Sequence, residues 1–388
     1  MSEAAEQCAV VREIDRLEIL VRTGANLNCT VIQGLDLRKA DLDWDHLTCR
    51  GAIFLGCVFP DHVTVTRLQE LGALVFPRFE GLPFDPYRPA LYSREELMEG
   101  WTPDKDESLD RRIYEHYVQH GKNHPDIVEA LAERLHDHAI DDALTDLLEG
   151  RVENDGRKKV VAIMGGHGTR RDAESYEGVV WLTRRLTQEG YFVASGGGPG
   201  TMEAANLGAW LARRSDEEVR EALAILQQAP YYTDEGFQAR AAEVAEKFPH
   251  GETSIAIPTW FYGHEPTNQF SNHVAKYFSN SIREDGLLAI ARHGIVFAPG
   301  SAGTTQEIFQ DAAQNHYASL GEVSPMVFFG KKRYVEETDL WQCLSDLAKG
   351  RHYADYLCLS DEVEEIVEFI KSHPPVRSDG GKVLSEKE

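Results

Sequence analysis

Two glycine-rich turns constrain what this chain can fold into, because each lies between an apolar run and a helical stretch. The first turn spans 195–203 (SGGGPGTME), and the second spans 299–307 (PGSAGTTQE). Glycines let the backbone approach a phosphate group closely, and the N-terminus of the following helix offers free N–H groups and the positive end of its dipole. The pair therefore predicts a phosphate site, and Glu307 adds a carboxylate beside it.

Apolar runs and helical stretches alternate from about residue 157 to 360. Continuous rather than alternating apolar character is typical of strands buried on both faces of a sheet. Five runs have it: 160–164, 191–194, 254–257, 294–298 and 326–329. We therefore expect an α/β fold with a Rossmann-like parallel sheet, flanking helices and a ligand crevice at the carboxyl ends of the strands. Both glycine turns fall at such ends.

A third glycine turn, at 164–169 (MGGHGT), follows the first of these runs. Counted from Gly166 and Gly168, Arg171 stands where the third glycine of a G-x-G-x-x-G dinucleotide motif would fall, so an NAD-binding domain is disfavoured. The sequence also lacks a G-x-x-x-x-G-K-[ST] motif, which excludes the usual P-loop NTPase. No tightly bound cofactor is expected.

Composition excludes further classes of protein. Asp and Glu number 64 against 40 Lys and Arg, giving a formal charge of −24 that opposes binding to nucleic-acid polymers. The six cysteines form no C-x-x-C pair, which argues against a zinc cluster or a disulfide framework. The first residues do not resemble a secretion signal, and no run approaches the roughly eighteen apolar residues of a membrane span. We expect a cytoplasmic protein with no membrane partner.

Three histidines are the nearest approach to a metal-ligand pattern. His116, His120 and His124 are spaced by fours, which would place them on one face of an unbroken helix. Gly121 and Pro125 interrupt that helix, so we interpret the three as a helix end and a polar loop. No metal site is predicted.

Residues 25–59 carry a five-residue rhythm of apolar residues, at Leu27, Ile32, Leu37, Leu42 and Leu47, which resumes after a slip of two residues. The rhythm resembles the pentapeptide repeat, whose family folds as a four-sided β-helix. An irregular β segment with chance spacing is the alternative. So short a stack would need capping or docking, because one repeat cannot bury its apolar face alone.

Four stretches resemble the LOG-like phosphoribohydrolases, especially their branch of bacterial nucleotide 5′-monophosphate nucleosidases. The family pattern P-G-G-x-G-T-x-x-E matches 299–307, except that Ser301 replaces the second glycine. The other stretches are 164–167, 196–203 and 265–272. They occur in the order of the family and cover roughly residues 157–350.

The resemblance implies hydrolysis of the N-glycosidic bond of nucleoside 5′-monophosphates to free base and ribose 5-phosphate, with no metal or cofactor, by a homodimer or higher oligomer. This reaction passes through an oxocarbenium-like centre, which calls for a carboxylate near the sugar and an anchored phosphate. The expected catalytic residues are Glu307 and Arg283. The expected substrate- and phosphate-binding residues are Gly165, Gly166, His167, Gly197, Gly198, Gly200, Thr201, Glu203, Asn268, Asn272, Gly300, Ser301, Gly303 and Thr304.

Five segments are expected along the chain. A helical lead at 1–24, the pentapeptide-like segment at 25–59 and a mainly helical region at 60–150 come first. The LOG-like nucleotide-binding catalytic domain follows at 151–371, and a flexible tail occupies 372–388. Within the domain, 215–247 is interpreted as two helices that form a lid or a dimer contact.

Several of these residues have a second interpretation. Thr304 and Glu307 also fit a capping box, in which the glutamate folds back onto its own helix. Glu203 fits a helix cap as well as a ligand contact. Arg283 is followed by Glu284 where the family usually has Lys beside Arg, so a surface arginine is the alternative.

The remaining alternatives concern aromatic, amide and histidine side chains. Asn268 and Asn272 are one helical turn apart, facing either ligand or solvent. His167 could either bind a ligand or pack in the core. Tyr231 and Tyr232 could either stack on a base or take part in apolar packing. At the level of the protein, a non-catalytic nucleotide-binding or sensing module is the alternative, and a scaffold acting through 25–59 is a third possibility.

Overall fold

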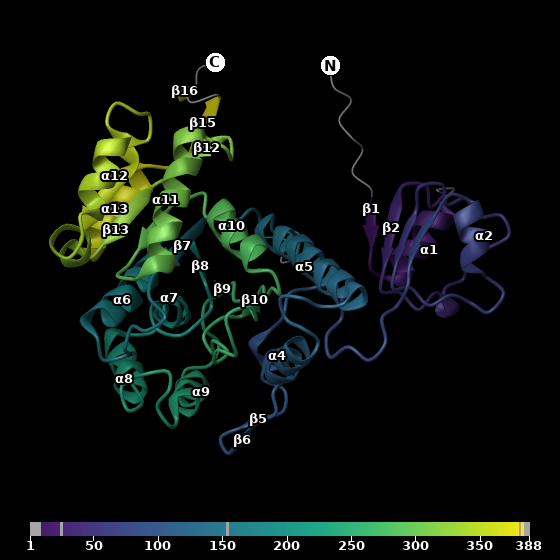
Figure 1. Ribbon diagram of the computed structural model, residues 1–388, viewed down its shortest axis with the longest axis horizontal. Coiled ribbons are helices and arrows are strands. Elements are labelled where there is room, and N and C mark those ends of the chain that lie inside the picture. The colour runs from purple at the N-terminus through teal and green to yellow at the C-terminus, as the bar shows by residue number, and fades with distance from the viewer. Residues whose placement is uncertain (1–8, 24–25, 153–154, 380–381, 384–388) are drawn as a thin grey trace. The chain divides into compact units, whose positions relative to one another are not determined.

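The computed structural model describes residues 9–23, 26–152, 155–379 and 382–383 (Figure 1). The chain divides into two compact units. Unit 1 contains Met1–Ala90 and Asn123–Ala143, and unit 2 contains Leu91–Lys122 and Leu144–Glu388. The segment limits expected from the sequence were drawn where its composition or residue pattern changes. The two units are instead defined by contacts, which join segments distant in the sequence.

The described residues of unit 1 build a parallel sheet of strands β1 (Ala9–Val11), β2 (Thr30–Gln33), β3 (Ile53–Leu55) and β4 (Leu74–Phe76), in that order. Each strand pairs with the next one along the chain, Ala9 with Thr30, Val31 with Ile53, and Ile53 with Leu74. Paired residues of neighbouring strands are separated by nearly the same number of residues each time. The chain therefore winds in stacked coils of nearly constant length.

The five-residue rhythm lies on the inside of these coils. Leu27, Ile32 and Leu37 are fully buried, and Leu47 is nearly so. Val31 and its partner Ile53 are separated by four five-residue repeats, one for each side of a coil, and the slip of two residues. The stack extends beyond 25–59 in both directions, because α1 (Ile14–Arg22) precedes β2 and α2 (Val65–Glu70) precedes β4. The short 3₁₀ helix η1 (Leu37–Lys39) follows β2.

Unit 2 is built on a parallel sheet, which confirms the expected fold class. Its order in the described chain is β10-β9-β8-β7-β11-β13-β14. The predicted runs form β7 (Val160–Met164), β8 (Phe192–Ser195), β9 (Ile255–Ala256), β11 (Ile295–Phe297) and β13 (Met326–Phe329). The sequence did not predict β10 (His273–Val274) or β14 (Leu357–Ser360).

Helices cover this sheet (Figure 1). The long ones are α5 (Ile127–Leu148), in which the division between units falls, and α6 (Glu174–Gln188), α7 (Thr201–Trp210), α8 (Asp216–Leu226), α9 (Phe237–Lys247), α10 (Asn280–Ile290), α11 (Ala302–Tyr317), α12 (Leu340–Ala348) and α13 (Val363–Ser372). Residues of β7, α6 and α7 belong to one core cluster, in which Val161, Tyr176 and Leu207 are fully buried. The two helices predicted in 215–247 are α8 and α9.

Leu91–Lys122 joins the sheet of unit 2 from a distant part of the sequence. Tyr92 and Val274 exchange backbone hydrogen bonds of 3.1 and 2.8 Å. The segment continues through α3 (Arg94–Leu97), the hairpin of β5 (Trp101–Thr102) and β6 (Lys105–Asp106), and α4 (Leu109–Gln119). Because α4 ends at Gln119, His124 lies outside it, as the interrupted pattern predicts.

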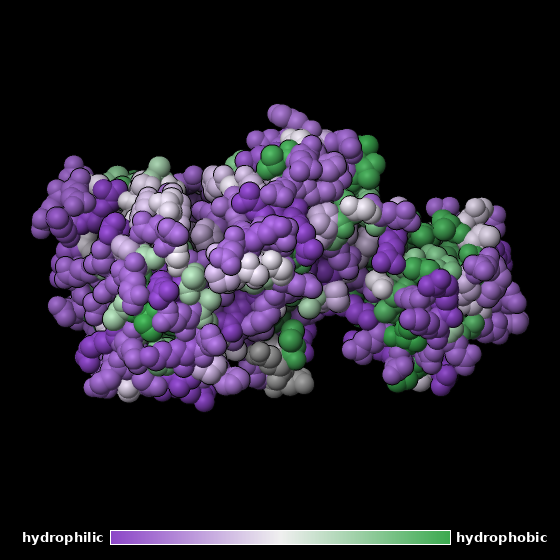
Figure 2. Space-filling view, turned by 90° about the horizontal axis from the view of Figure 1, so that it is seen from below, coloured by the Kyte–Doolittle hydropathy of each residue, from purple (hydrophilic) through white to green (hydrophobic). Residues whose placement is uncertain are grey.

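Strands also form at the carboxyl end of the described chain. Part of the segment expected as a tail is β15 (Val376–Asp379), which pairs with β12 (Glu322–Val323) and with β16 (Lys382–Val383). Two short helical turns complete unit 2, η2 (Lys332–Glu336) and η3 (Ala354–Tyr356). None of the described helices is both long and apolar enough to cross a bilayer. Hydrophilic residues cover most of the face seen in Figure 2.

Candidate functional site

The three glycine turns meet at the centre of the unit 2 sheet. They follow β7, β8 and β11, which are neighbours in the order β8-β7-β11. After β7 the chain adds β8, β9 and β10 on one side and then returns to place β11 on the other. Ligands of open parallel sheets bind at such a reversal, outside the carboxyl ends of the strands.

Backbone hydrogen bonds join the turns to one another. The N–H of Gly166 donates to the carbonyl of Pro299 at 3.1 Å, and the N–H of Thr201 donates to the carbonyl of Gly166 at 3.1 Å. A Cβ added at Gly300 would lie 2.1 Å from the hydroxyl oxygen of Thr304, so no larger residue fits there without a shift. The turns therefore form one connected surface.

Two helices begin at this surface with their first N–H groups uncapped by side chains. Gly200, which has no side chain, precedes α7, and Ser301 precedes α11 without accepting a capping hydrogen bond on its hydroxyl within the described chain. The turns differ in access, because Ser301, Ala302 and Gly303 are exposed whereas Gly197, Gly198, Gly200 and Thr201 are buried. An anion can thus reach the start of α11 directly.

Glu307 lies in the second turn of α11 and is free of the cap that its spacing suggested. Because α11 begins at Ala302, Thr304 is inside the helix rather than at its start, and the capping box does not form. Among the described residues no hydrogen bond or ion pair engages the Glu307 carboxylate. Burial raises the pKa of Glu307 to about 7, against the charge of Arg283 and with the help of Glu284.

Arg283 is a buried residue of α10, which excludes the alternative of a surface arginine. Its Nε donates to the carbonyl of Ile257 at 3.0 Å. Its charge lowers the pKa of Glu307, so the two belong to one electrostatic site. Glu284 is the residue that departs from the family pattern. Its carboxylate accepts hydrogen bonds from Tyr262 and Gln306, both of 3.2 Å.

Glu203 has a structural role that neither sequence interpretation anticipated. Arg171 donates to its carboxylate from Nε at 2.8 Å and from Nη2 at 2.5 Å, and the Tyr176 hydroxyl donates at 2.8 Å. Arg171 also donates to the carbonyls of Ala229 and Phe237, at 3.2 and 3.0 Å. Both carboxylate oxygens of Glu203 thus accept hydrogen bonds inside the protein, and its contact with a ligand stays a prediction.

Asn268 and Asn272 do not lie on a helix, so the expected common face is also corrected. The Nδ2 of Asn268 donates to Asn206 Oδ1 at 2.9 Å, and its Oδ1 accepts from the N–H of Phe270 at 3.0 Å. The Oδ1 of Asn272 accepts from the N–H of Ser254 at 3.3 Å. Both amides shape an irregular loop between β9 and β10.

Aromatic rings border the third turn. His167 is exposed, and its ring lies 5.7 Å from that of Tyr232, which packs at 4.6 Å against Tyr231. The hydrogen bond with Tyr231 raises the pKa of Tyr232, with a contribution from Glu265. Glu265 reaches the turn after β8, since a Cβ on Gly198 would lie 2.8 Å from its Oε2. His167 is thus at the surface and not in the core.

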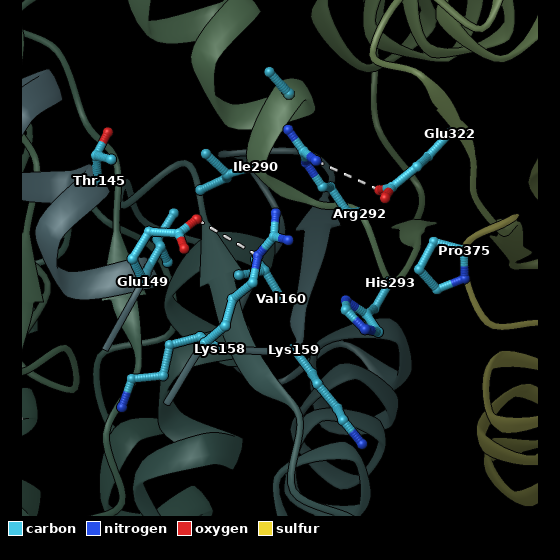
Figure 3. A pocket seen from close by; sticks show the side chains of 13 residues that line it. Thr145, Glu149, Lys158, Lys159, Val160, Ile290, Arg292, His293, Glu322 and Pro375 are labelled. Carbon is cyan, nitrogen blue, oxygen red and sulfur yellow. Dashed lines mark ion pairs between the residues drawn. The ribbon is translucent and has the colours of Figure 1, made fainter. Parts of the chain in front are cut away.

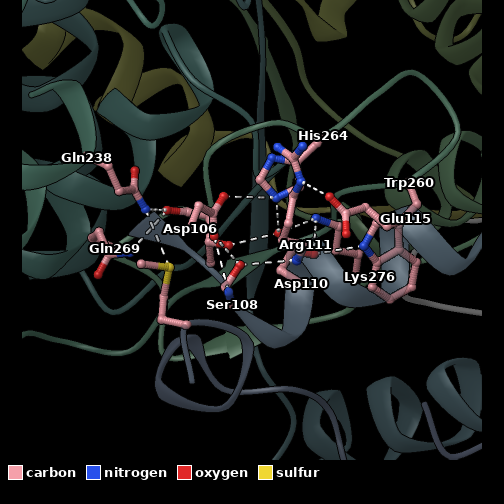
Figure 4. Close-up of polar contacts among 12 residues, drawn as sticks. Asp106, Ser108, Asp110, Arg111, Glu115, Gln238, Trp260, His264, Gln269 and Lys276 are labelled. Carbon is pink, nitrogen blue, oxygen red and sulfur yellow. Dashed lines mark hydrogen bonds and ion pairs between the residues drawn. The ribbon is translucent and has the colours of Figure 1, made fainter. Parts of the chain in front are cut away.

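The loop that carries Glu265 is anchored by a buried ionic cluster (Figure 4). Asp110 of α4 is fully buried and accepts hydrogen bonds from Trp260 Nε1 at 2.7 Å, Thr267 Oγ1 at 2.9 Å and Lys276 Nζ at 2.9 Å. Burial alone would raise the pKa of Asp110, but Lys276 and these hydrogen bonds outweigh it and lower that pKa. The cluster fixes the loop to α4.

Sequence reasoning missed three buried residues near the site. Arg171 was noticed solely as a missing glycine, and Tyr176 not at all. Asp311 lies one helical turn after Glu307; burial raises its pKa to about 8, and its Oδ2 has no hydrogen bond within the described chain. The four-residue spacing of two acids on one helix face was the available signal for Asp311.

A cavity of about 490 Å³ lies at the amino end of the sheet, beside Val160 at the start of β7 (Figure 3). Arg157 pairs with Glu149 at 3.6 Å, and Arg292 pairs with Glu322 at 3.5 Å. α5 and α10 both end at this cavity, and cations near helix C-termini complement the negative ends of the dipoles. Its basic residues therefore have a structural explanation, and the glycine turns lie at the opposite end of the strands.

No protein-family profile and no curated protein matches the sequence. The Moco carrier protein of Chlamydomonas reinhardtii has a similar structure, with 16% identity and a TM-score of 0.35 over 56% of this chain and 97% of that protein. A molybdenum cofactor binding protein from the bacterium Rippkaea orientalis has 14% identity and a TM-score of 0.36 over 56% and 97%. The protein TM1055 has 20% identity and a TM-score of 0.34 over 55% and 99%. The similarity covers about half of this chain and says nothing of function.

Proposed function

We propose that the protein is a nucleoside 5′-monophosphate phosphoribohydrolase, which cleaves the N-glycosidic bond and releases the base and ribose 5-phosphate. The observation that carries the proposal is Glu307, a half-buried carboxylate without a hydrogen-bond partner in the described chain, one and a half turns from the exposed start of α11. Few carboxylates are buried without a partner unless a ligand uses them.

Each part of the site has a role in this reaction. The N–H groups at Ser301–Thr304 hold the 5′-phosphate at the N-terminus of α11. The ionised Glu307 then stabilises the positive charge that develops on the ribose, or orients the attacking water. Arg283 lowers the pKa of Glu307 and so favours its ionised form, and in this proposal its guanidinium contacts the sugar hydroxyls or the phosphate. The expected homo-oligomer belongs to the same proposal.

The second candidate is a nucleotide-binding module without catalysis. Ser301 favours it, because a side chain stands at the exposed helix start where the family pattern has glycine. Such a side chain narrows the approach of a phosphate to the backbone.

Incubation with a panel of nucleoside 5′-monophosphates, followed by chromatography for free base, tests both candidates. We expect release by the wild type and a loss of roughly 10²- to 10⁴-fold in Glu307→Gln. Glu217→Gln, on an exposed position of α8, is the matched control and should behave as wild type. Binding without release by the folded wild type would favour the second candidate and end the first.

A further inference from the structure

A second cavity lies beside the candidate site. It has a volume of about 310 Å³ and is lined by Trp101 and Asp106 of the β5–β6 hairpin, by Tyr232 and Gln238, and by His264. The hairpin lies outside the part of the sequence that resembles the nucleosidases.

This cavity lies next to the glycine turns. Tyr232 lines it, and the ring of Tyr232 lies 5.7 Å from that of His167 in the turn after β7. Pro266 lines it as well, next to Glu265, which reaches the turn after β8. The cavity therefore borders the place where the turns would hold a ligand.

The walls combine flat apolar surfaces with hydrogen-bond acceptors. Trp101 and Tyr232 offer rings for stacking. Figure 4 shows Asp106 between Gln238 and His264. The Oδ1 of Asp106 accepts from the Ser108 hydroxyl at 2.6 Å, while its Oδ2 lies 3.7 Å from His264 Nε2, too far for a hydrogen bond. Asp106 Oδ2 is thus an acceptor with capacity left.

Two further features fit a polar ligand. The Nε2 of His264 is buried without a hydrogen bond in the described chain, and burial lowers the pKa of this histidine, which keeps it neutral. Two neighbours of Asp106 in the wall are held in place, because Thr267 donates to the buried Asp110 and Ser108 caps α4 by accepting from the N–H of Arg111 at 3.1 Å, while Asp106 itself is exposed. A preformed pocket with one orienting acceptor is typical of a specificity site.

We propose that this cavity selects the base of the substrate, and that Asp106 favours bases with an exocyclic amino group over those with a carbonyl in its place. A carboxylate accepts a hydrogen bond from an amino group and repels a carbonyl oxygen. AMP and IMP differ at C6, which carries an amino group in AMP and a carbonyl in IMP, and at N1, which carries a proton only in IMP; Asp106→Asn therefore has to show that the preference depends on this carboxylate. The inference rests on the proposed function, since it names the preferred substrates of that site.

The test compares kcat/KM for AMP and IMP in the full-length protein. We expect the wild type to favour AMP by about ten- to a hundredfold, the value of one hydrogen bond to a charged group. Asp106→Asn should reduce this ratio to near one, while inhibition by the product ribose 5-phosphate stays unchanged because it does not reach the cavity. Asp104→Asn, in the loop of the same hairpin and outside the cavity, is the control.

The outcomes separate this inference from the proposed function. Equal use of AMP and IMP by the wild type, or an unchanged ratio in Asp106→Asn, would overturn the inference and leave the nucleosidase intact. If no nucleotide is cleaved, the proposed function fails, and calorimetric binding of AMP and IMP to the same variants decides the role of the cavity. A change in ribose 5-phosphate inhibition in Asp106→Asn would mean a general distortion and also count against the inference.

Discussion

The pKa of Glu307 is set mainly by burial and adjusted by two charged neighbours. Burial raises its pKa to about 7, Glu284 adds to the rise, and Arg283 counters it. A carboxylate that stabilises a developing cation has to be ionised, so the protonation of this one group should govern the reaction.

We therefore expect kcat/KM to rise with pH through about 7 and to fall tenfold per unit well below it. Arg283→Met removes the positive neighbour and should move the midpoint to higher pH, whereas Glu284→Gln removes a negative one and should move it lower. The pH dependence of kcat/KM in the three proteins measures these shifts. Midpoints that coincide would show that another group controls the rate.

The surroundings of a single residue could be predicted where they depend on its spacing from nearby residues. They could not be predicted where they depend on a partner far away in the sequence. Ser301, Thr304 and Glu307 lie together at one helix start, as their local spacing predicts. The bonds of Glu203 to Arg171, 32 residues away, and of Asn268 to Asn206, 62 residues away, were not predicted. No local pattern contains these distances.

At the scale of elements, Arg171 fastens three parts of unit 2 together. Its guanidinium pairs with Glu203 of α7 and donates to the carbonyls of Ala229 and Phe237, which border the link between α8 and α9. It also stacks 3.4 Å over the ring of Phe237. The segment proposed as a lid or a dimer contact is thus anchored to the turn after β7.

Glu203→Ala should destabilise the protein by roughly 3–5 kcal/mol, because it leaves a buried guanidinium without its counter-charge. Glu217→Ala, on the exposed face of α8, should change stability by no more than about 0.5 kcal/mol. Urea unfolding followed by circular dichroism compares the two. A small effect in Glu203→Ala would mean that water replaces the lost carboxylate.

Elements were predictable where composition is uniform along a segment. The continuous apolar run at Val160–Met164 is a fully buried strand as expected. β10, at His273–Val274, has two residues and a polar side chain, so no periodicity could reveal it. The sequence pattern showed only part of the length of the stack in unit 1. In its outer coils α1 and α2 take the place of the five-residue repeat, so the repeat could not reveal them.

At the scale of the molecule, the candidate site and the coiled stack belong to different units. Every residue assigned to the reaction lies in unit 2, whereas Phe54 and its apolar neighbours form a separate core cluster in unit 1.

Phe54→Ala should therefore lower the stability of unit 1 by about 3–5 kcal/mol, since it empties a fully buried site in the stack. Base release at about 25 °C, where the variant is still folded, should be unchanged. Thermal unfolding and the nucleotide assay on one preparation provide the comparison. Reduced release by the folded variant would give the stack a part in catalysis.

The division of the chain also limits how such a protein can arise. Each unit consists of two separate stretches of sequence, so the chain passes between units three times. A break at residue 150 would take Tyr92 and Asp110 away from Val274 and Lys276, their partners in the sheet unit. Neither unit can be gained, lost or exchanged through a single genetic junction, and the two have to be inherited as one piece.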